Sequence, residues 1–153
     1  MKNTLLSTLL LTTLLSGCAS VQMEPEAASN KAKEFNPPSK GMSGVYIYRE
    51  DTHLGAALKK DVWIDGRCIG ETAKGVFFYE EVEGDKEHKF STESEFSPND
   101  IVIKTVMGDL YFFEQALRFG AFVGGAELEQ KESGVGKKEM ELLKMATKGQ
   151  CSE

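Results

Sequence analysis

The stretch from Asp61 to Glu71, DVWIDGRCIGE, constrains the fold more than any other part of the sequence. Asp65 and Gly66 form the pair that favours positive φ in a two-residue β-turn, and β-forming residues lie on both sides of it. Val62 to Ile64 would lead into the turn and Arg67 to Glu71 would lead out of it. The stretch therefore predicts a β-hairpin within the chain.

Similar short segments of β-forming residues, separated by turn residues, follow one another along the chain. Counting the two arms of the hairpin, they predict seven or eight strands; the other segments are GVYIYRE, GVFFYEEV, EHKFSTE, IVIKTV, LYFFEQAL and AELEQKE. No helical pattern interrupts the series. We therefore expect residues 41–149 to form an all-β domain of antiparallel sheets, either sandwich-like or an open barrel.

One helix is expected at the C-terminal end, from about Lys137 to Lys148. On a helical wheel, Met140, Leu142, Leu143 and Ala146 fall on one side and lysine and glutamate side chains cluster opposite. The polar face mixes both signs of charge, which favours a helix packed over the sheet rather than one lying on a membrane.

The N-terminus has the form of an export signal. Lys2 precedes an uncharged run of 12 residues, Thr4 to Leu15, which is shorter than the roughly 20 apolar residues of a membrane-spanning helix. The run ends in Leu15-Ser16-Gly17-Cys18, which closely resembles the bacterial lipobox. The resemblance implies that residues 1–17 are a signal peptide and that Cys18 is the lipidated first residue of the mature protein, held in the membrane by two or three acyl chains such as palmitate. An ordinary signal with a chance cysteine is the alternative.

Alanine, not aspartate, follows Cys18, which favours the outer membrane over the inner membrane of the bacterial envelope. Residues 18–40 are expected to form the lipidated N-terminus and a flexible tether, because they show hardly any apolar periodicity. As a coil, residues 19–40 would hold the domain about 25 to 30 Å from the lipid.

The net charge narrows the possible partners. Loss of Lys2 with the signal peptide lowers the net charge from −6 to −7, which disfavours nucleic acid and favours basic partners.

The cysteine content allows one disulfide. Lipidation of Cys18 would leave Cys68 and Cys151. These two could form a disulfide in the oxidising periplasm, or Cys151 could lie in a frayed C-terminal tail.

The sequence has no recognised catalytic or metal-binding motif. The two histidines, His53 and His88, occur in EDTHLG and DKEHKF, outside any HExxH motif, and no paired CxxC occurs. SGVGKKE lacks the first glycine and the final serine or threonine of a phosphate-binding loop. We therefore expect no catalytic residue, no metal site and no cofactor.

Two features could serve binding. The first is a set of aromatic residues that either form a stacking surface or belong to the core beneath a helix: Tyr46, Tyr48, Trp63, Phe77, Tyr79, Tyr111 and Phe113. The second is the glycine-rich loop from Arg118 to Ala126, in which Arg118, Phe119 and Phe122 would form a binding surface. The alternative is a loop tucked into the core or a glycine-rich strand edge.

The order of these motifs is similar to that of a bacterial family of small lipoproteins of unknown function. The resemblance rests on GVYIYR, VWIDGRCIGET and GVFFYEEVEGDKEHKF and covers about residues 42–131. It implies an all-β, sandwich-like domain and carries over no catalytic residue. The family's proline-glycine turn before a histidine is replaced here by Glu83 to His88.

Together these observations predict a lipid-anchored envelope protein that is a non-enzymatic binding or structural module. Its partner would be an envelope protein or glycan. The alternatives are an inhibitor of a basic hydrolase or toxin, and an envelope enzyme with an unrecognised site around His53 or His88.

Overall fold

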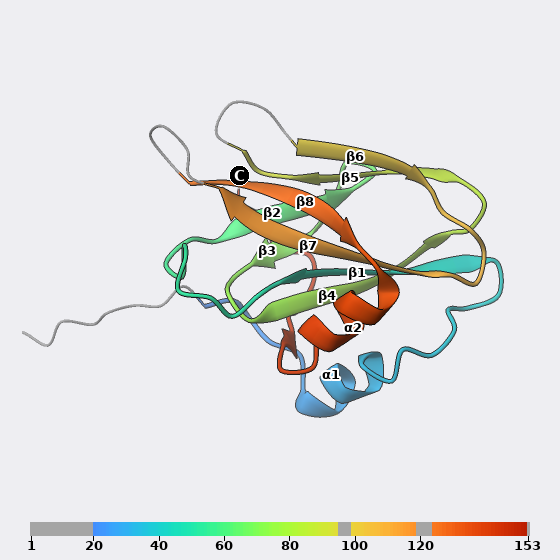
Figure 1. Cartoon of the computed structure of the whole chain (residues 1–153), viewed down its shortest axis with the longest axis horizontal. Coiled ribbons are helices and arrows are strands. Elements are labelled where there is room, and N and C mark those ends of the chain that lie inside the picture. The colour runs from blue at the N-terminus through green and yellow to red at the C-terminus, as the bar shows by residue number, and fades with distance from the viewer. Residues whose placement is uncertain (1–19, 95–98, 119–123, 153) are drawn as a thin grey trace, which may run out of the picture.

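The computed structural model describes residues 20–94, 99–118 and 124–152. The expected signal peptide, Cys18, Phe119 and Phe122 lie outside these residues. The described chain forms two sheets packed face to face, with two short helices on the outer side of one of them (Figure 1). The elements in chain order are α1 (Glu26–Ala32), β1 (Met42–Arg49), β2 (Lys60–Ile64), β3 (Arg67–Thr72), β4 (Val76–Glu83), β5 (Glu87–Thr92), β6 (Asn99–Lys104), β7 (Leu110–Arg118), β8 (Gly125–Lys131), α2 (Ser133–Glu139) and β9 (Lys144–Met145).

The sandwich-like all-β fold expected from the sequence is confirmed. One sheet has four antiparallel strands in the order β3-β2-β5-β6. The other has five strands in the order β8-β7-β1-β4-β9 and is mixed, because β1 pairs in parallel with β7 and β4 pairs in parallel with β9. The chain leaves this sheet twice to build the four-stranded one. It forms β2 and β3 between β1 and β4, and it forms β5 and β6 between β4 and β7.

The predicted hairpin is present. Asp65 and Gly66 have φ values of 53° and 75° and join β2 to β3. These positive values are those of a type I′ turn, whose twist suits two antiparallel strands.

Strand β1 is buried on both faces, which explains why consecutive residues from Val45 to Tyr48 are all apolar or aromatic. Val45 and Ile47 belong to the core between the sheets. Tyr46 and Tyr48 belong to a second cluster between the outer face of the five-stranded sheet and the residues that cover it. The domain therefore has two apolar layers, and the helices are required to cover the outer one.

The C-terminal helix predicted over Lys137 to Lys148 is wrong in its bounds. The helix α2 ends at Glu139, and Lys144 and Met145 form β9 beside Val76 and Phe77 of β4. Met140, Leu143 and Ala146 are buried as the pattern required, but in an irregular turn and a strand. Leu142, the fourth residue of the predicted apolar face, is 91% exposed. Sheet pairing has overridden the local helical spacing.

The tether predicted before residue 41 also differs from the structure. Residues 26–32 form α1, and the preceding residues join the sheet edge through a bridge between Met23 and Ala146. Val21 and Phe35 pack against the two apolar clusters. This part of the chain is therefore folded onto the domain. None of the helices in the described residues is long and apolar enough to cross a membrane.

Candidate functional site

A groove of about 370 Å³ lies between α1 and the outer face of the five-stranded sheet. Ala28, Lys31 and Ala32 of α1 form one side, and Tyr46 and Tyr79 lie on the other. Small side chains on α1 leave room between the helix and the tyrosine rings. The groove has the size of a site for a small ligand or for one or two side chains of a larger partner.

Strand pairing places the two tyrosines side by side. Tyr46 on β1 is the register partner of Tyr79 on β4, and their ring centroids are 4.7 Å apart. Tyr46 is only 1% exposed, stacks on Phe112 and donates its hydroxyl to the carbonyl of Ala32 at 2.7 Å. Tyr46 therefore fixes the end of α1 over the sheet, whereas half-buried Tyr79 presents its ring to the groove.

Glu81 supplies the negative charge of the groove. Its Oε1 accepts the Tyr79 hydroxyl at 3.0 Å and the backbone N–H of Ser39 at 3.1 Å. Burial alone would raise the pKa of Glu81, but the hydrogen bonds from Ser39 and Tyr79 outweigh it and lower the pKa. The carboxylate is thus ionised and held in place.

The phenols of the groove are held in their neutral form. Burial, followed by the charge of Glu81, raises the pKa of Tyr46 to about 12. Burial, followed by the hydrogen bond to Glu81, also raises the pKa of Tyr79. Neutral phenols beside an ionised carboxylate suit recognition by ring contact and hydrogen bonding rather than nucleophilic attack by a phenolate.

The seven aromatic residues do not form one exposed surface. Tyr46, Tyr48 and Phe77 are buried beneath the helices, and Phe113 lies between the sheets. Trp63, Tyr79 and Tyr111 are half-buried. For most of these aromatic residues, the prediction that they belong to the core is confirmed. Tyr79 instead lines the groove.

Arg118 is engaged by the strand next to it. Its Nε donates to Glu127 at 2.6 Å, and its guanidinium also contacts Glu129, both on β8. The guanidinium therefore joins β7 to β8 at the start of the glycine-rich loop. The predicted surface of Arg118, Phe119 and Phe122 includes two residues outside those described, and it stays a prediction.

The histidines lie in different parts of the fold. His53 is exposed in the loop after β1, whereas His88 on β5 is only 4% exposed. Nδ1 of His88 lies 2.6 Å from Asp65 Oδ2, and Nε2 lies 2.8 Å from the carbonyl oxygen of Glu83. Both ring nitrogens are thus engaged in joining β5 to neighbouring turns. Among the described residues, no group of three or more His, Cys, Asp or Glu side chains could hold a metal ion.

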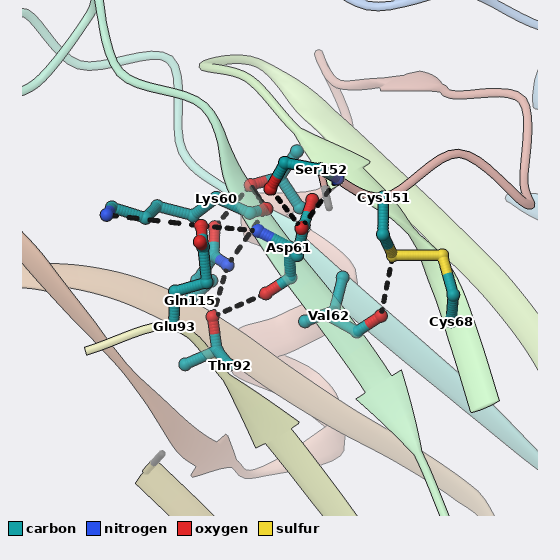
Figure 2. Close-up of a disulfide and its surroundings, with 10 residues drawn as sticks. Lys60, Asp61, Val62, Cys68, Thr92, Glu93, Gln115, Cys151 and Ser152 are labelled. Atoms are coloured by element: carbon teal, nitrogen blue, oxygen red, sulfur yellow. Dashed lines mark hydrogen bonds and ion pairs between the residues drawn. A yellow bond between two sulfur atoms is a disulfide. The ribbon is translucent and has the colours of Figure 1, made fainter. Parts of the chain in front are cut away.

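Cys68 and Cys151 form a disulfide in the structure. Cys68 and Cys151 have Cα atoms 6.1 Å apart and join β3 to the C-terminal tail. Figure 2 shows Ser152 next to this disulfide, where its N–H and hydroxyl donate to Oδ2 of Asp61 at 2.8 and 2.5 Å. The described part of the tail is therefore held against β2 and β3 rather than frayed.

Sequence reasoning missed the α1 side of the groove and the role of Glu81. The signals of a helix were present: Pro25 precedes it, Glu26 lies in its first turn and Lys31 in its last. The buried side of α1 carries alanine and serine, so apolar periodicity could not reveal it. No local pattern distinguishes Glu81 from the neighbouring glutamates.

Comparison with known proteins agrees with the resemblance on one point, membership of a family of unknown function. Residues 39–126, more than half of the chain, match the model of a family described as "Protein of unknown function (DUF2846)". The chain belongs to this family. The DUF2846 match covers β1 to β7 and reaches into β8, but it does not include α1.

A longer similarity links the chain to an "Uncharacterized protein" of Haemophilus influenzae. The two are 54% identical over 133 residues, which cover 87% of this chain and 78% of the relative. No solved structure matches the chain.

Proposed function

We propose that this chain is a lipid-anchored, non-enzymatic binding module of the bacterial cell envelope. The observation that carries the anchor is the sequence Leu15-Ser16-Gly17-Cys18 at the end of an uncharged apolar run. Acylated Cys18 would hold the domain in the membrane, and Ala19 after it favours the outer membrane. Two or three acyl chains suffice for stable attachment.

The groove beside α1 is the proposed binding site. The Tyr79 ring offers an apolar face, and ionised Glu81 beside it accepts hydrogen bonds. This pair fits an envelope protein or glycan that brings a flat apolar surface together with hydroxyl or cationic donors. The net charge of −7 for the mature chain adds a long-range preference for basic partners.

Two measurements test this proposal. Mass spectrometry of the mature N-terminal peptide should find acyl chains on Cys18, and Cys18→Ser should release the protein from the membrane fraction. An unmodified N-terminus would refute the anchor.

The binding site is tested by in-cell photocrosslinking from a probe at Lys31, which lines the groove. We expect a defined partner whose yield falls several-fold in Tyr79→Ala. Tyr79→Phe is the matched control, because it removes only the hydroxyl bonded to Glu81 and keeps the ring. Equal crosslinking by the native protein and Tyr79→Ala would exclude the groove as the site.

A further inference from the structure

The first described residues form the outer edge of the five-stranded sheet. The backbone N–H of Glu24 donates to the carbonyl of Met145 at 2.9 Å, and that of Thr147 donates to the carbonyl of Gln22 at 2.8 Å. Val21, just before them, packs against the core between the sheets. The chain is therefore bound to the domain from its first described residues onward.

This pairing leaves little chain between the proposed anchor and the fold. One residue separates Cys18 from Ser20, and two peptide units span at most about 7 Å. A flexible tether of residues 19–40 would have allowed about 25 to 30 Å. A lipidated Cys18 would thus bring this edge of the sheet directly to the membrane surface.

An exposed leucine lies at the same edge. Leu142, in the turn between α2 and β9, is 91% exposed, and Met23 is 38% exposed. Ser20, Met23 and Leu142 line one hollow of about 310 Å³. The most exposed large apolar side chain of the described residues therefore lies beside the chain that leads to Cys18.

Lys33 of the segment after α1 holds the turn that carries Leu142. Its ammonium donates to the carbonyls of Glu141 and Leu143 at 3.0 and 3.1 Å. Since both neighbouring carbonyls are held, the turn presents Leu142 outward in a fixed position.

The charges near this edge are of both signs. Lys74 pairs with Asp51 at 3.1 Å, and Lys144 lies beside exposed Glu141. Such a surface has no strong preference for anionic lipid, so contact with a membrane would depend on the anchor and on Leu142.

We propose that Met23 and Leu142 form an anchor face that rests on the lipid leaflet holding the acyl chains of Cys18. Leu142 enters the boundary between headgroups and acyl chains, and the domain takes one orientation on the membrane. This inference rests on the proposed lipidation. One leucine would not hold a soluble domain on a bilayer, but it can orient a domain that is already attached a few ångströms away.

This orientation has a consequence for the groove. Ser29 and Lys33 line the hollow beside Leu142, whereas Ala28, Lys31 and Ala32 line the groove with Tyr79. The helix α1 thus separates the anchor face from the groove. A partner in the groove would be bound close to the membrane surface but not within it.

The test places a fluorescent reporter at the anchor face of the full-length lipidated protein. Leu142→Cys provides a free thiol, because Cys68 and Cys151 form a disulfide and Cys18 is acylated. The matched control is Val102→Cys, also exposed, at 58%, on β6. Figure 1 shows β6 on the side of the molecule opposite α1 and the turn after α2.

Both variants are labelled with NBD and reconstituted into vesicles of phosphatidylethanolamine and phosphatidylglycerol. We expect blue-shifted emission at position 142 and quenching by lipid-borne nitroxide that is several-fold stronger than at position 102. Equal emission and equal quenching at the two positions would overturn the proposal. So would a label at position 142 that is shielded in cell envelopes but water-exposed in vesicles, because a protein partner would then cover the face.

Vesicle flotation separates a failure of the inference from a failure of the anchor. Protein that floats with the vesicles but shows no contrast between the two labels is anchored without a fixed orientation. Protein that does not float lacks the lipid, which overturns the proposed anchoring and with it the anchor face.

Discussion

His88 is tied to Asp65 across the end of the four-stranded sheet, with Nδ1 2.6 Å from Oδ2. The other oxygen of Asp65 accepts the backbone N–H of Lys89 at 2.8 Å. Burial would raise the pKa of Asp65, but the hydrogen bonds from His88 and Lys89 outweigh it and lower the pKa below its ordinary 3.8. The carboxylate of Asp65, in the turn of the β2–β3 hairpin, thus holds this turn against β5 through hydrogen bonds to His88 and Lys89.

We predict that Asp65→Asn lowers the free energy of unfolding by about 0.5 to 1 kcal/mol at neutral pH, a modest loss because the carboxylate is half exposed. Asparagine tolerates the positive φ at this position, so the turn itself is kept. Because the pKa is lower in the folded state, the stabilisation is present above pH 3.8 and is lost as the pH falls through the folded value. Urea unfolding over a range of pH should show the two proteins converging in acid. If the difference in unfolding free energy between the native protein and Asp65→Asn stayed constant with pH, the charge of Asp65 would not be the cause of the stabilisation.

Asp61 should show the opposite behaviour. It is 1% exposed, and its Oδ1 has no hydrogen-bond partner in the described structure. Burial raises its pKa, more than the hydrogen bonds from Ser152 lower it. Its ionisation therefore costs stability as the pH rises through the unfolded and then the folded pKa.

We expect Asp61→Asn to raise the free energy of unfolding by about 1 kcal/mol at neutral pH, because the buried charge is removed and an amide oxygen can still accept from Ser152. Asp61→Ala is the control, and it should destabilise because it also removes that acceptor. Urea unfolding measures both. A less stable Asn variant would show that the carboxylate has a partner that compensates its burial.

Features of the fold that depend on adjacent residues were predicted correctly from the sequence, whereas features that depend on contacts distant in sequence were not. The Asp65-Gly66 turn is specified by two adjacent residues, and it was predicted with both of its strands. The helix expected to Lys148 failed because the spacing of Met140, Leu143 and Ala146 is explained equally well by an irregular turn and a short strand. What decides between them is the pairing of Lys144 and Met145 with β4, a contact distant in sequence. The groove depends on α1 and β4 meeting, which no local pattern encodes.

The disulfide between Cys68 and Cys151 should stabilise the domain substantially. It closes a loop with a sequence separation of 83 residues, for which the loss of chain entropy in the unfolded state corresponds to about 4.5 kcal/mol. Cys151→Ser should lower the urea midpoint, and the reduced native protein should unfold at a similar midpoint. If Cys151→Ser matched the oxidised native protein, the bridge would have no effect on stability.

Glu24 should exchange its amide hydrogen slowly, because residues 22–24 form an edge of the sheet. We expect protection at Glu24, whose N–H is bonded to Met145, whereas exposed Gln22 provides an unbonded comparison in the same segment. Hydrogen exchange followed by NMR measures both. A flexible tether would instead show fast exchange throughout residues 20–40.

Two glycines of α2 offer a matched pair that tests how the helix packs. A Cβ on Gly136 would lie 2.5 Å from Cβ of Phe112 on β7, whereas one on Gly134 would meet nothing within 4 Å. Gly136→Ala should therefore lower the free energy of unfolding by about 1 to 2 kcal/mol, because the steric cost exceeds the gain in helix propensity. Gly134→Ala should raise it by about 0.5 to 1 kcal/mol, because only the propensity changes. Urea unfolding compares the two variants, and equal stabilisation by both would show that α2 does not rest on Phe112, leaving the apolar layer around Tyr46 and Tyr48 without that part of its cover.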